Sequence, residues 1–267
     1  MEAIKEQIVK TVVKSGNGGA VWVPKNWLGE EVIVTLPEKP KLSLKEEVLR
    51  ILMPHLKDIT AVFLYGSYAR HEQTSDSDID VLVVAKEKFQ INIKKKIELQ
   101  IVQIEELKNT IKKNPIYYQI IREAESIINS QLLEELKNIK IDFKKFKWFI
   151  ETTKEHIKSN KELIELDKLD NKYLSSYSVL YSIMLRLRAI FIINCIIKNK
   201  EFSNKLFKKW VLGHKIANSD YENAYKIYKS VRDNIKIKIK IEITFAEKLL
   251  GILIKEIENL QEKIYGK

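Results

Sequence analysis

The sequence has few of the residues that build disulfides or zinc sites. Its 267 residues include one cysteine, Cys195, and four histidines that lie far apart along the chain. A single thiol excludes an internal disulfide and any metal site built from several cysteines. No basic-then-apolar leader opens the chain, and its apolar runs fall short of the roughly 20 residues that a bilayer span needs. We therefore expect a cytoplasmic protein that does not enter a membrane.

Arginine is also scarce, since the 47 basic residues comprise 41 Lys and 6 Arg, and the formal net charge is +11. This charge is unevenly distributed. Residues 1–60 carry +1, residues 61–140 carry zero, and residues 141–267 carry +10 from 26 basic and 16 acidic side chains. Concentrated positive charge attracts acidic partners, whereas a general bias toward lysine produces only a solvated surface. Either reading concerns the C-terminal segment.

The first 37 residues have the pattern of short strands joined by tight turns. Strands are predicted over residues 8–13, 20–23 and 31–36, with a glycine- and asparagine-rich turn at 15–19 and one helical turn at 24–29. Fewer than about 40 residues bury too little surface to be stable alone. The segment should therefore form a dimer or pack against the rest of the chain.

Residues 13–25 combine a strand, a Gly-Asn-x-Gly turn, a second strand and a Pro-Lys pair. This pattern resembles the swapped-hairpin (AbrB-like) DNA-binding modules, over about residues 7–37. The resemblance implies a homodimer in which Lys14 and Lys25 contact DNA. However, Ala20 stands where such modules often have arginine, and residues 1–37 carry four Lys and four Glu. A dimerisation hairpin that does not bind DNA is the alternative.

A linker and a helix separate this segment from the centre of the chain. Pro37 and Pro40 bracket the linker, because neither residue continues a sheet interior. A helix is predicted from Ser43 to Lys57, with Ser43 and Glu46 in the spacing of a capping box.

The central segment carries the residues that indicate chemistry. A strand predicted over residues 61–65 ends at Gly66-Ser67, and a second strand begins after Asp78-Ile79-Asp80. Asp78 and Asp80 are two residues apart in an extended chain and project from the same face. Two adjacent carboxylates repel each other unless a cation lies between them. Gly66 lets backbone amides approach a phosphate, and Ser67 offers a hydroxyl and an amide.

This order of strand, Gly-Ser, Ala-Arg, Ser-Asp-Ile-Asp and strand resembles the nucleotidyltransferases of the DNA polymerase β superfamily, of the minimal type, over residues 43–130. The resemblance implies that Asp78 and Asp80 hold two Mg²⁺ ions and that Gly66 and Ser67 grip the phosphates of an NTP donor. One ion would lower the pKa of the attacking hydroxyl, and the other would carry the triphosphate. The alternative is a turn followed by an ordinary strand.

A full site of this kind has a third carboxylate on a neighbouring strand. Residues 97–102 alternate as a strand does, and Glu98 is the candidate ligand or general base. A register slip of one residue would turn Glu98 to the other face. Gln100 shares its face, and without Glu98 the site would have only two carboxylates.

Helical patterns occupy the chain from Phe143 onward. A long apolar helix is predicted over residues 173–197, and shorter ones over 203–210, 221–232 and 244–263. The stretch 235–241 alternates isoleucine and lysine, which fits either a strand or an extended linker.

Two arginines interrupt the apolar helix. Arg186 and Arg188 are expected to pair with a carboxylate or a phosphate, and they are candidate contacts to the acceptor or the triphosphate. The segment resembles the helical (HEPN-like) bundles found beside minimal nucleotidyltransferases. Because no Arg-x(4–6)-His motif occurs after residue 140, we expect a substrate-binding or packing domain and not a nuclease.

The sequence thus predicts an α+β multi-domain chain with a β-hairpin module over residues 1–37, a mixed-sheet nucleotidyltransferase domain over 41–130 and an all-α bundle over 141–267. The predicted activity moves NMP from an NTP to a hydroxyl acceptor on RNA, protein or a small molecule. The alternative is a DNA-binding regulator or antitoxin-like protein, in which the nucleotidyltransferase fold senses or modifies a partner.

Overall fold

The computed structural model describes residues 6, 8, 10–34, 43–75, 77–91 and 96–266. The chain divides into two compact units, residues 1–43 and 44–267. The predicted linker between Pro37 and Pro40 lies outside the described residues.

The first unit contains a two-stranded antiparallel hairpin, in which β1 (Val13–Ser15) pairs with β2 (Gly18–Ala20). Gly16 takes a positive φ of 55° in the turn between them, as the glycine-rich turn predicted. One 3-10 turn follows at η1 (Lys25–Trp27).

The strands of this unit are shorter than the sequence predicted, and they lie closer to the turn. They overlap the predicted strands 8–13 and 20–23 only at Val13 and Ala20, and most of the predicted turn 15–19 belongs to the strands. The pairing begins only at Val13 and ends at Ala20, and residues 31–34 form no strand, while residues 35 and 36 of the third predicted strand lie outside the described part of the chain. The physical reason is the lack of a covered face, because an isolated hairpin gains little from burial. Trp22, Leu28 and Ile33 are 72%, 76% and 94% exposed.

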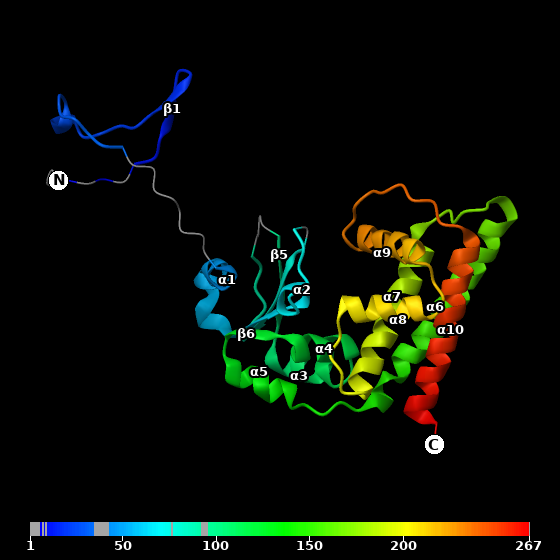
Figure 1. Ribbon diagram of the computed structural model, residues 1–267. Helices are drawn as coiled ribbons and strands as arrows, with labels where there is room; N and C mark the ends of the chain where they lie inside the picture. Colours follow the sequence, from blue (N-terminus) through cyan, green and yellow to red (C-terminus); the bar gives the residue numbers. More distant parts are fainter. Residues whose placement is uncertain are drawn as a thin grey trace. The chain divides into compact units, whose positions relative to one another are not determined.

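The second unit begins with a mixed four-stranded sheet in the order β5-β4-β3-β6. The central strand β3 runs antiparallel to β4 and β6, and β4 runs parallel to β5. Both central strands are nearly continuous apolar runs because helices cover both faces of the sheet (Figure 1). The strands are β3 (Ile59–Tyr65), β4 (Ile79–Ala85), β5 (Ile97–Val102) and β6 (Glu125–Ile128).

Six short helical segments surround this sheet. Phe63 and Leu82 pack on one face against α3, α4 and α5, and Val62 and Val83 pack on the other against α1. Asn114 caps α4 through its side chain, which accepts from the Ile116 N–H. The segments are α1 (Leu44–Leu52), η2 (Met53–Asp58), α2 (Gly66–Ala69), α3 (Ile104–Ile111), α4 (Pro115–Glu123) and α5 (Ser130–Lys137).

The single helix predicted from Ser43 to Lys57 is wrong in its second half. The α-helix ends at Leu52, and a 3-10 segment containing Pro54 follows. Proline has no N–H to donate and its ring clashes with the preceding turn, so the α-helical hydrogen-bond ladder cannot continue through this position.

The remaining chain is all helical except for its connections. α7 lies at the centre and packs against α6, α9 and α10. Tyr118 of α4 packs against the cores of both the sheet module and the bundle. The α+β class, with hairpin, mixed sheet and helical region, is confirmed. The helical elements are η3 (Phe143–Phe146), α6 (Lys147–Asp170), α7 (Tyr177–Ile197), α8 (Asn204–Gly213), α9 (Asn218–Arg232) and α10 (Ile243–Tyr265).

Helix α7 corrects the expectation that every apolar run is too short to span a bilayer. Among the described residues, it is the one helix long and apolar enough to do so by length and composition. Yet 61% of its most apolar window is buried inside the protein. The core helix of a bundle has the same composition, so this feature is weak evidence for a membrane.

The isoleucine–lysine stretch is an extended connection and forms no strand. Residues 235–241 make no ladder, and only an isolated bridge joins Tyr173 to Glu242. The Tyr177 hydroxyl donates to the Ile239 carbonyl at 2.7 Å and accepts from the Ile239 N–H at 2.8 Å. A half-buried side chain therefore satisfies backbone groups that a neighbouring strand would otherwise pair.

Candidate functional site

The predicted carboxylates lie at one end of the sheet. Tyr65, the last residue of β3, is the register partner of Asp80 on β4, and Asp80 is the partner of Glu98 on β5. Register partners on adjacent strands project from the same face. Asp78 lies just before β4 and is exposed. The structure thus brings Glu98 beside Asp80, the register on which its predicted role depends.

Gly66 begins α2 immediately after β3 and allows a close approach by Asp80. Its φ is +74°, and a Cβ at this position would lie 1.9 Å from the Asp80 Oδ2 and 2.8 Å from its Cγ. Any larger residue would collide with the carboxylate and would also adopt a strained conformation. The packing of Asp80 is therefore a reason for glycine here that the sequence did not reveal.

The Gly66 amide is already engaged. Its N–H donates to Glu123 Oε1 at 3.0 Å, so in this structure it points to a protein carboxylate. The predicted contact of Gly66 and Ser67 with phosphate remains a prediction. Glu123, at the end of α4, was missed by sequence reasoning because 57 residues separate it from Gly66.

The acidic cluster has an electrostatic cost. Burial, and next the Glu98 carboxylate, raises the pKa of Asp80 to about 6, while Arg232 and Arg70 oppose that rise. Among the described residues, no hydrogen bond or ion pair engages the carboxylate of Asp78, Asp80 or Glu98. These oxygen ligands therefore fit a hard divalent cation, whose charge would relieve the repulsion between them.

The protein does not enclose such a cation by itself. Within the described ranges, no three His, Cys, Asp or Glu side chains converge into a metal-holding group. Mg²⁺ is usually held by one or two carboxylates together with water and substrate phosphates. The Asp80 and Glu98 carboxylates, side by side at the end of the sheet, suit that mode of binding.

A chain of polar side chains lies beside the carboxylates. The Tyr65 hydroxyl donates to Gln100 Oε1 at 3.5 Å, and the Gln100 amide donates to the Tyr117 hydroxyl. Burial, and next the charge of Asp80, raises the pKa of the Tyr65 phenol, so it remains a neutral donor. Gln100, which sequence analysis placed on the face of Glu98, is thus held by tyrosines.

The two arginines of α7 do not pair with carboxylates as expected. Arg186 donates to the hydroxyls of Thr152 and Thr153 at 3.2 and 3.4 Å. Arg188 donates to Asn204 Oδ1 at 2.9 Å and lies over the Phe202 ring at 4.8 Å. Hydroxyl, amide and ring contacts therefore provide protein partners in place of the expected carboxylates, and the expected contact with a phosphate stays a prediction.

Three further basic side chains bear on the predicted DNA contact and on the carboxylates. Lys14 lies in β1 and Lys25 begins η1, both exposed in the first unit. Arg232, which sequence reasoning missed, ends α9 and is near enough to Asp80 to lower its pKa. Its Nε donates to Asp233 Oδ1 at 2.6 Å.

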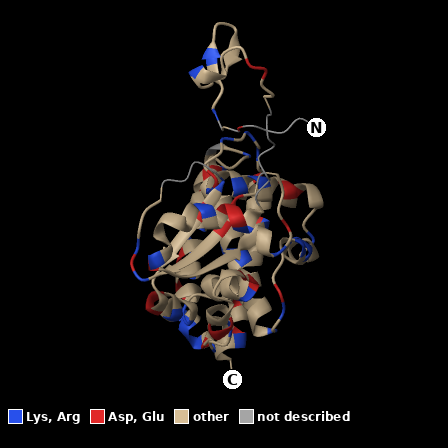
Figure 2. Ribbon diagram, turned by 90° about the vertical axis from the view of Figure 1, so that its left-hand side faces the viewer, with Lys and Arg blue, Asp and Glu red and all other residues tan. Residues whose placement is uncertain are grey.

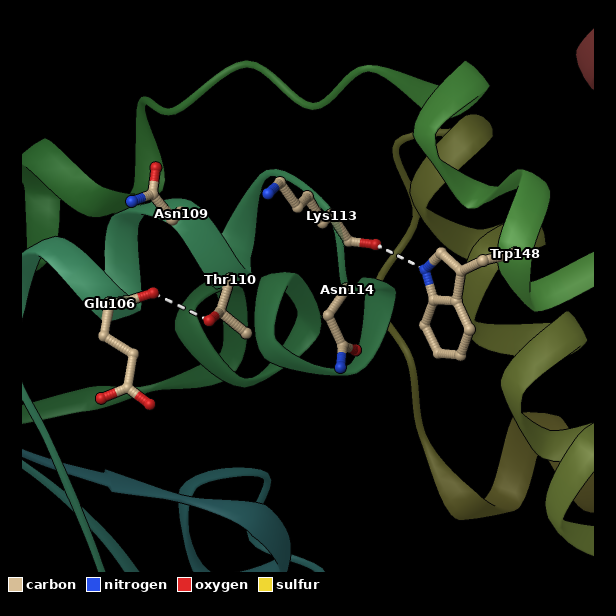
Figure 3. A pocket seen from close by; sticks show the side chains of 6 residues that line it. All are labelled: Glu106, Asn109, Thr110, Lys113, Asn114 and Trp148. Carbon is tan, nitrogen blue, oxygen red and sulfur yellow. Dashed lines mark hydrogen bonds between the residues drawn. The ribbon is translucent and has the colours of Figure 1, made fainter.

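An open hollow of about 460 Å³ lies elsewhere on the surface (Figure 3). It contains none of the carboxylates described above. The Trp148 indole donates to the Lys113 carbonyl at 3.4 Å along its wall. The hollow is lined by Glu106, Asn109, Thr110, Lys113, Asn114 and Trp148.

Comparison with known proteins identifies the central segment. Residues 46–132 match the family model described as Polymerase beta, Nucleotidyltransferase. The chain is 31% identical to "Putative protein adenylyltransferase MJ0141" of Methanocaldococcus jannaschii over 104 residues, which make up 36% of this chain and 98% of that protein. It is 36% identical to "Putative protein adenylyltransferase MJ0126" of the same organism over 89 residues, 31% of this chain and 89% of that protein.

Two solved structures are similar at a lower level. Spectinomycin adenyltransferase AAD(9) from Enterococcus faecialis, solved with ATP and spectinomycin, has 17% identity and a TM-score of 0.41, covering 79% of this chain and 97% of that one. A nucleotidyltransferase-like protein from Exiguobacterium sibiricum has 11% identity and a TM-score of 0.38, covering 83% of this chain and 77% of that one.

Replacing Gly66 with alanine should destabilise the protein. The new Cβ would displace the Asp80 carboxylate and adopt a strained backbone conformation, which costs about 2–3 kcal/mol. Gly213→Ala is the matched control, because a Cβ there meets nothing within 4 Å. Urea denaturation should show the loss for Gly66→Ala only. Equal stability of the two variants would contradict the close approach of Asp80.

Replacing Asp80 with asparagine should stabilise the protein at pH 7 in EDTA. The folded pKa of Asp80, about 6, exceeds its ordinary value of 3.8, so its stabilising contribution is lost as pH rises through 6. We expect a gain of about 1–2 kcal/mol in the free energy of unfolding at pH 7. The gain should vanish near pH 3.5, where the carboxyl is protonated in both states. A gain that does not depend on pH would contradict this electrostatic cause.

Proposed function

Because the chain belongs to the polymerase beta nucleotidyltransferase family and is a nucleotidyltransferase enzyme, we propose that it transfers AMP from ATP to a hydroxyl group of a protein, in a Mg²⁺-dependent reaction. The observation that carries the proposal is the register of Asp80 and Glu98 on adjacent strands beside the Gly66 turn. The names of the two relatives support adenylate as the transferred group and protein as the acceptor.

Asp78 and Asp80 would hold the magnesium ions, with Glu98 as a third ligand or general base. When bound, the ions would polarise the phosphates and the acceptor hydroxyl. Glu98, exposed at the start of β5, can receive the hydroxyl proton as the hydroxyl oxygen forms a bond to the α-phosphorus of ATP. The bond between the α-phosphorus and the oxygen that bridges to the β-phosphate breaks, and pyrophosphate leaves.

Gly66 and Ser67 would hold the donor phosphates at the turn between β3 and α2. The turn lies beside Asp80, so phosphates bound there would reach the carboxylates. Arg232 is near enough to Asp80 to add positive charge to the same region. Arg186 and Arg188 lie in α7 of the helical bundle, from which they would contact an acidic acceptor or the triphosphate.

The bundle carries most of the positive charge of the chain, which would attract an acidic acceptor. Residues 141–267 carry the excess of +10 from 26 basic and 16 acidic side chains, and Figure 2 shows Lys and Arg interspersed with Asp and Glu over the second unit of the chain. Mixed charge of this kind also gives a solvated surface. An RNA acceptor is therefore the second candidate, and transfer of labelled adenylate can distinguish it from a protein acceptor.

Asp78→Asn and Glu98→Gln should each lower adenylate transfer by at least about 100-fold, because each removes a charge that the reaction needs. The measurement uses ATP labelled at the α-phosphate, MgCl₂ and lysate of the source organism, followed by separate protease and ribonuclease digestion. Glu106→Gln is the control. It also removes one carboxylate charge, but Glu106 lies in the hollow of Figure 3, which contains none of the carboxylates at the sheet end.

Protease-sensitive label in the wild-type reaction supports a protein acceptor, and ribonuclease-sensitive label assigns RNA. If Asp78→Asn retained full transfer, the carboxylates would not be the catalytic centre. Full activity in EDTA would remove the divalent cation from the mechanism.

A second role concerns the first unit. We propose that the segment over residues 1–37 pairs two copies of the chain, with DNA binding through Lys14 and Lys25 as a regulator or antitoxin-like protein would use it. The exposed apolar side chains of Trp22, Leu28 and Ile33 favour association, because each would gain from burial. The neutral charge of the segment argues against strong phosphate contact.

Ile33→Glu should convert a dimer of the full chain into a monomer. The charge would be buried without a partner in the interface, a cost that exceeds the gain from pairing. Light scattering after gel filtration measures the mass, and Leu166→Glu, at an exposed leucine of α6, is the control. A wild-type monomer at micromolar concentration would refute the pairing. A DNA mobility shift unaffected by Lys14→Glu with Lys25→Glu would refute DNA contact through this segment.

A further inference from the structure

The N-terminus of α8 receives a cap from outside the bundle. The Glu72 carboxylate, in the loop after α2, accepts from the Asn204 N–H at 3.0 and 3.1 Å, from the Asn204 side-chain amide at 3.0 Å and from the Lys205 N–H at 3.4 Å. The helix also has its own cap, because Ser203 Oγ accepts from the Leu206 N–H at 3.1 Å. Glu72 is therefore an additional anion at a helix terminus that favours negative charge.

Glu72 is also one of two carboxylates that hold Arg70. The Arg70 Nε donates to Glu72 Oε2 at 3.0 Å, and its Nη1 donates to Glu123 Oε1 at 2.5 Å. The Arg70 side chain is 11% exposed, and that of Glu123 is 8% exposed. Removing one partner from a buried ionic network leaves the others insufficiently compensated.

Phe202 joins the bundle to this network through its ring. Arg70 lies over the ring at 5.3 Å and Arg188 at 4.8 Å, and Arg188 donates to the same Asn204 that Glu72 contacts. Arg70 pairs with both Glu72 and Glu123, and the charge of Arg188 opposes the rise in the pKa of Glu123. Figure 1 shows α8 beside α9, with its first turn on the side of α2.

The network ends at the Gly66 turn. Glu123 Oε1 accepts from Arg70 and from the Gly66 N–H, while its Oε2 accepts from the Gln119 amide at 3.0 Å. Gly66 in turn packs against Asp80. Continuous contacts therefore run from Asn204 of α8 through Glu72, Arg70 and Glu123 to the turn proposed to hold the nucleotide phosphates.

We propose that Glu72 is a positioning residue, through which the seating of the helical bundle on the sheet module sets the Gly66 turn for nucleotide binding. This inference rests on the proposed nucleotide role of that turn. Without Glu72, Arg70 would lose one of its two carboxylates and would be free to reorient. The hold of Glu123 on the Gly66 N–H would then weaken, and nucleotide affinity would fall although Glu72 itself contacts no nucleotide.

A comparison of Glu72→Gln with Ser203→Ala tests this role, because both weaken the cap of α8 but only the first removes a negative charge that pairs with Arg70. Both variants should lower Tm by about 2–4 °C. Only Glu72→Gln should raise the Kd for ATP with MgCl₂, and the KM in the transfer reaction, by roughly tenfold, with a much smaller change in kcat. It should also accelerate hydrogen exchange of the Gly66 amide, which needs no nucleotide.

Equal Kd values and equal Gly66 exchange in the two variants would overturn the proposal and leave Glu72 as a cap only. If Glu72→Gln fails to fold, Arg70→Lys provides the same comparison, since lysine keeps the charge but cannot bridge both carboxylates as the guanidinium does. If the wild-type chain binds no ATP, the proposed function fails, and Gly66 exchange still decides whether the network positions the turn.

Discussion

The structure of the site depends on the close approach of the Asp80 carboxylate to the Cα of Gly66. The carboxylate occupies the space that a Cβ would fill, which is open only at a glycine. That approach requires β3 and β4 to pair with Tyr65 opposite Asp80, so that the strand end and the turn meet at the same level of the sheet. The parallel pairing of β4 with β5 then brings Glu98 to the same place.

Two carboxylates near this point are buried in different ways. Glu123 is surrounded by donors from Gly66, Arg70 and Gln119, although burial still raises its pKa. Asp80 lacks such donors among the described residues, and its pKa is raised to about 6. The first arrangement supports the fold. The second keeps carboxylate oxygens available at a cost in stability, as functional sites commonly do.

Local sequence patterns predicted the elements that depend on local physics. The alternation of residues 97–102 corresponds to β5, and the strand predicted over residues 61–65 corresponds to β3. The prediction failed where distant residues decide the outcome. Glu123 and Arg232 approach the site from helices far along the chain, and Arg188 takes Asn204 and Phe202 as partners in place of an acid. No periodicity in a single sequence encodes such contacts.

The net charge of +11 is likewise less informative than the geometry of a few side chains. Its excess lies in the helical bundle, which carries 16 acidic as well as 26 basic side chains, whereas the acidic strand ends lie in a module of zero net charge. The contact between them is made by particular groups, among them Tyr118, which packs on both cores, and the Glu72 carboxylate at the start of α8. Short-range pairing therefore connects the two parts more specifically than overall charge does.

We propose that Asp78 and Asp80, beside the Gly66–Ser67 turn, form a nucleotide-binding catalytic centre. A crystal structure of the full chain with MgCl₂ and a non-hydrolysable ATP analogue tests it most directly. We predict electron density for the triphosphate at the Gly66–Ser67 turn, with a divalent cation between the phosphates and the carboxylates of Asp78 and Asp80. Triphosphate density at another place, such as the hollow lined by Trp148, with no cation at Asp80, would contradict the claim.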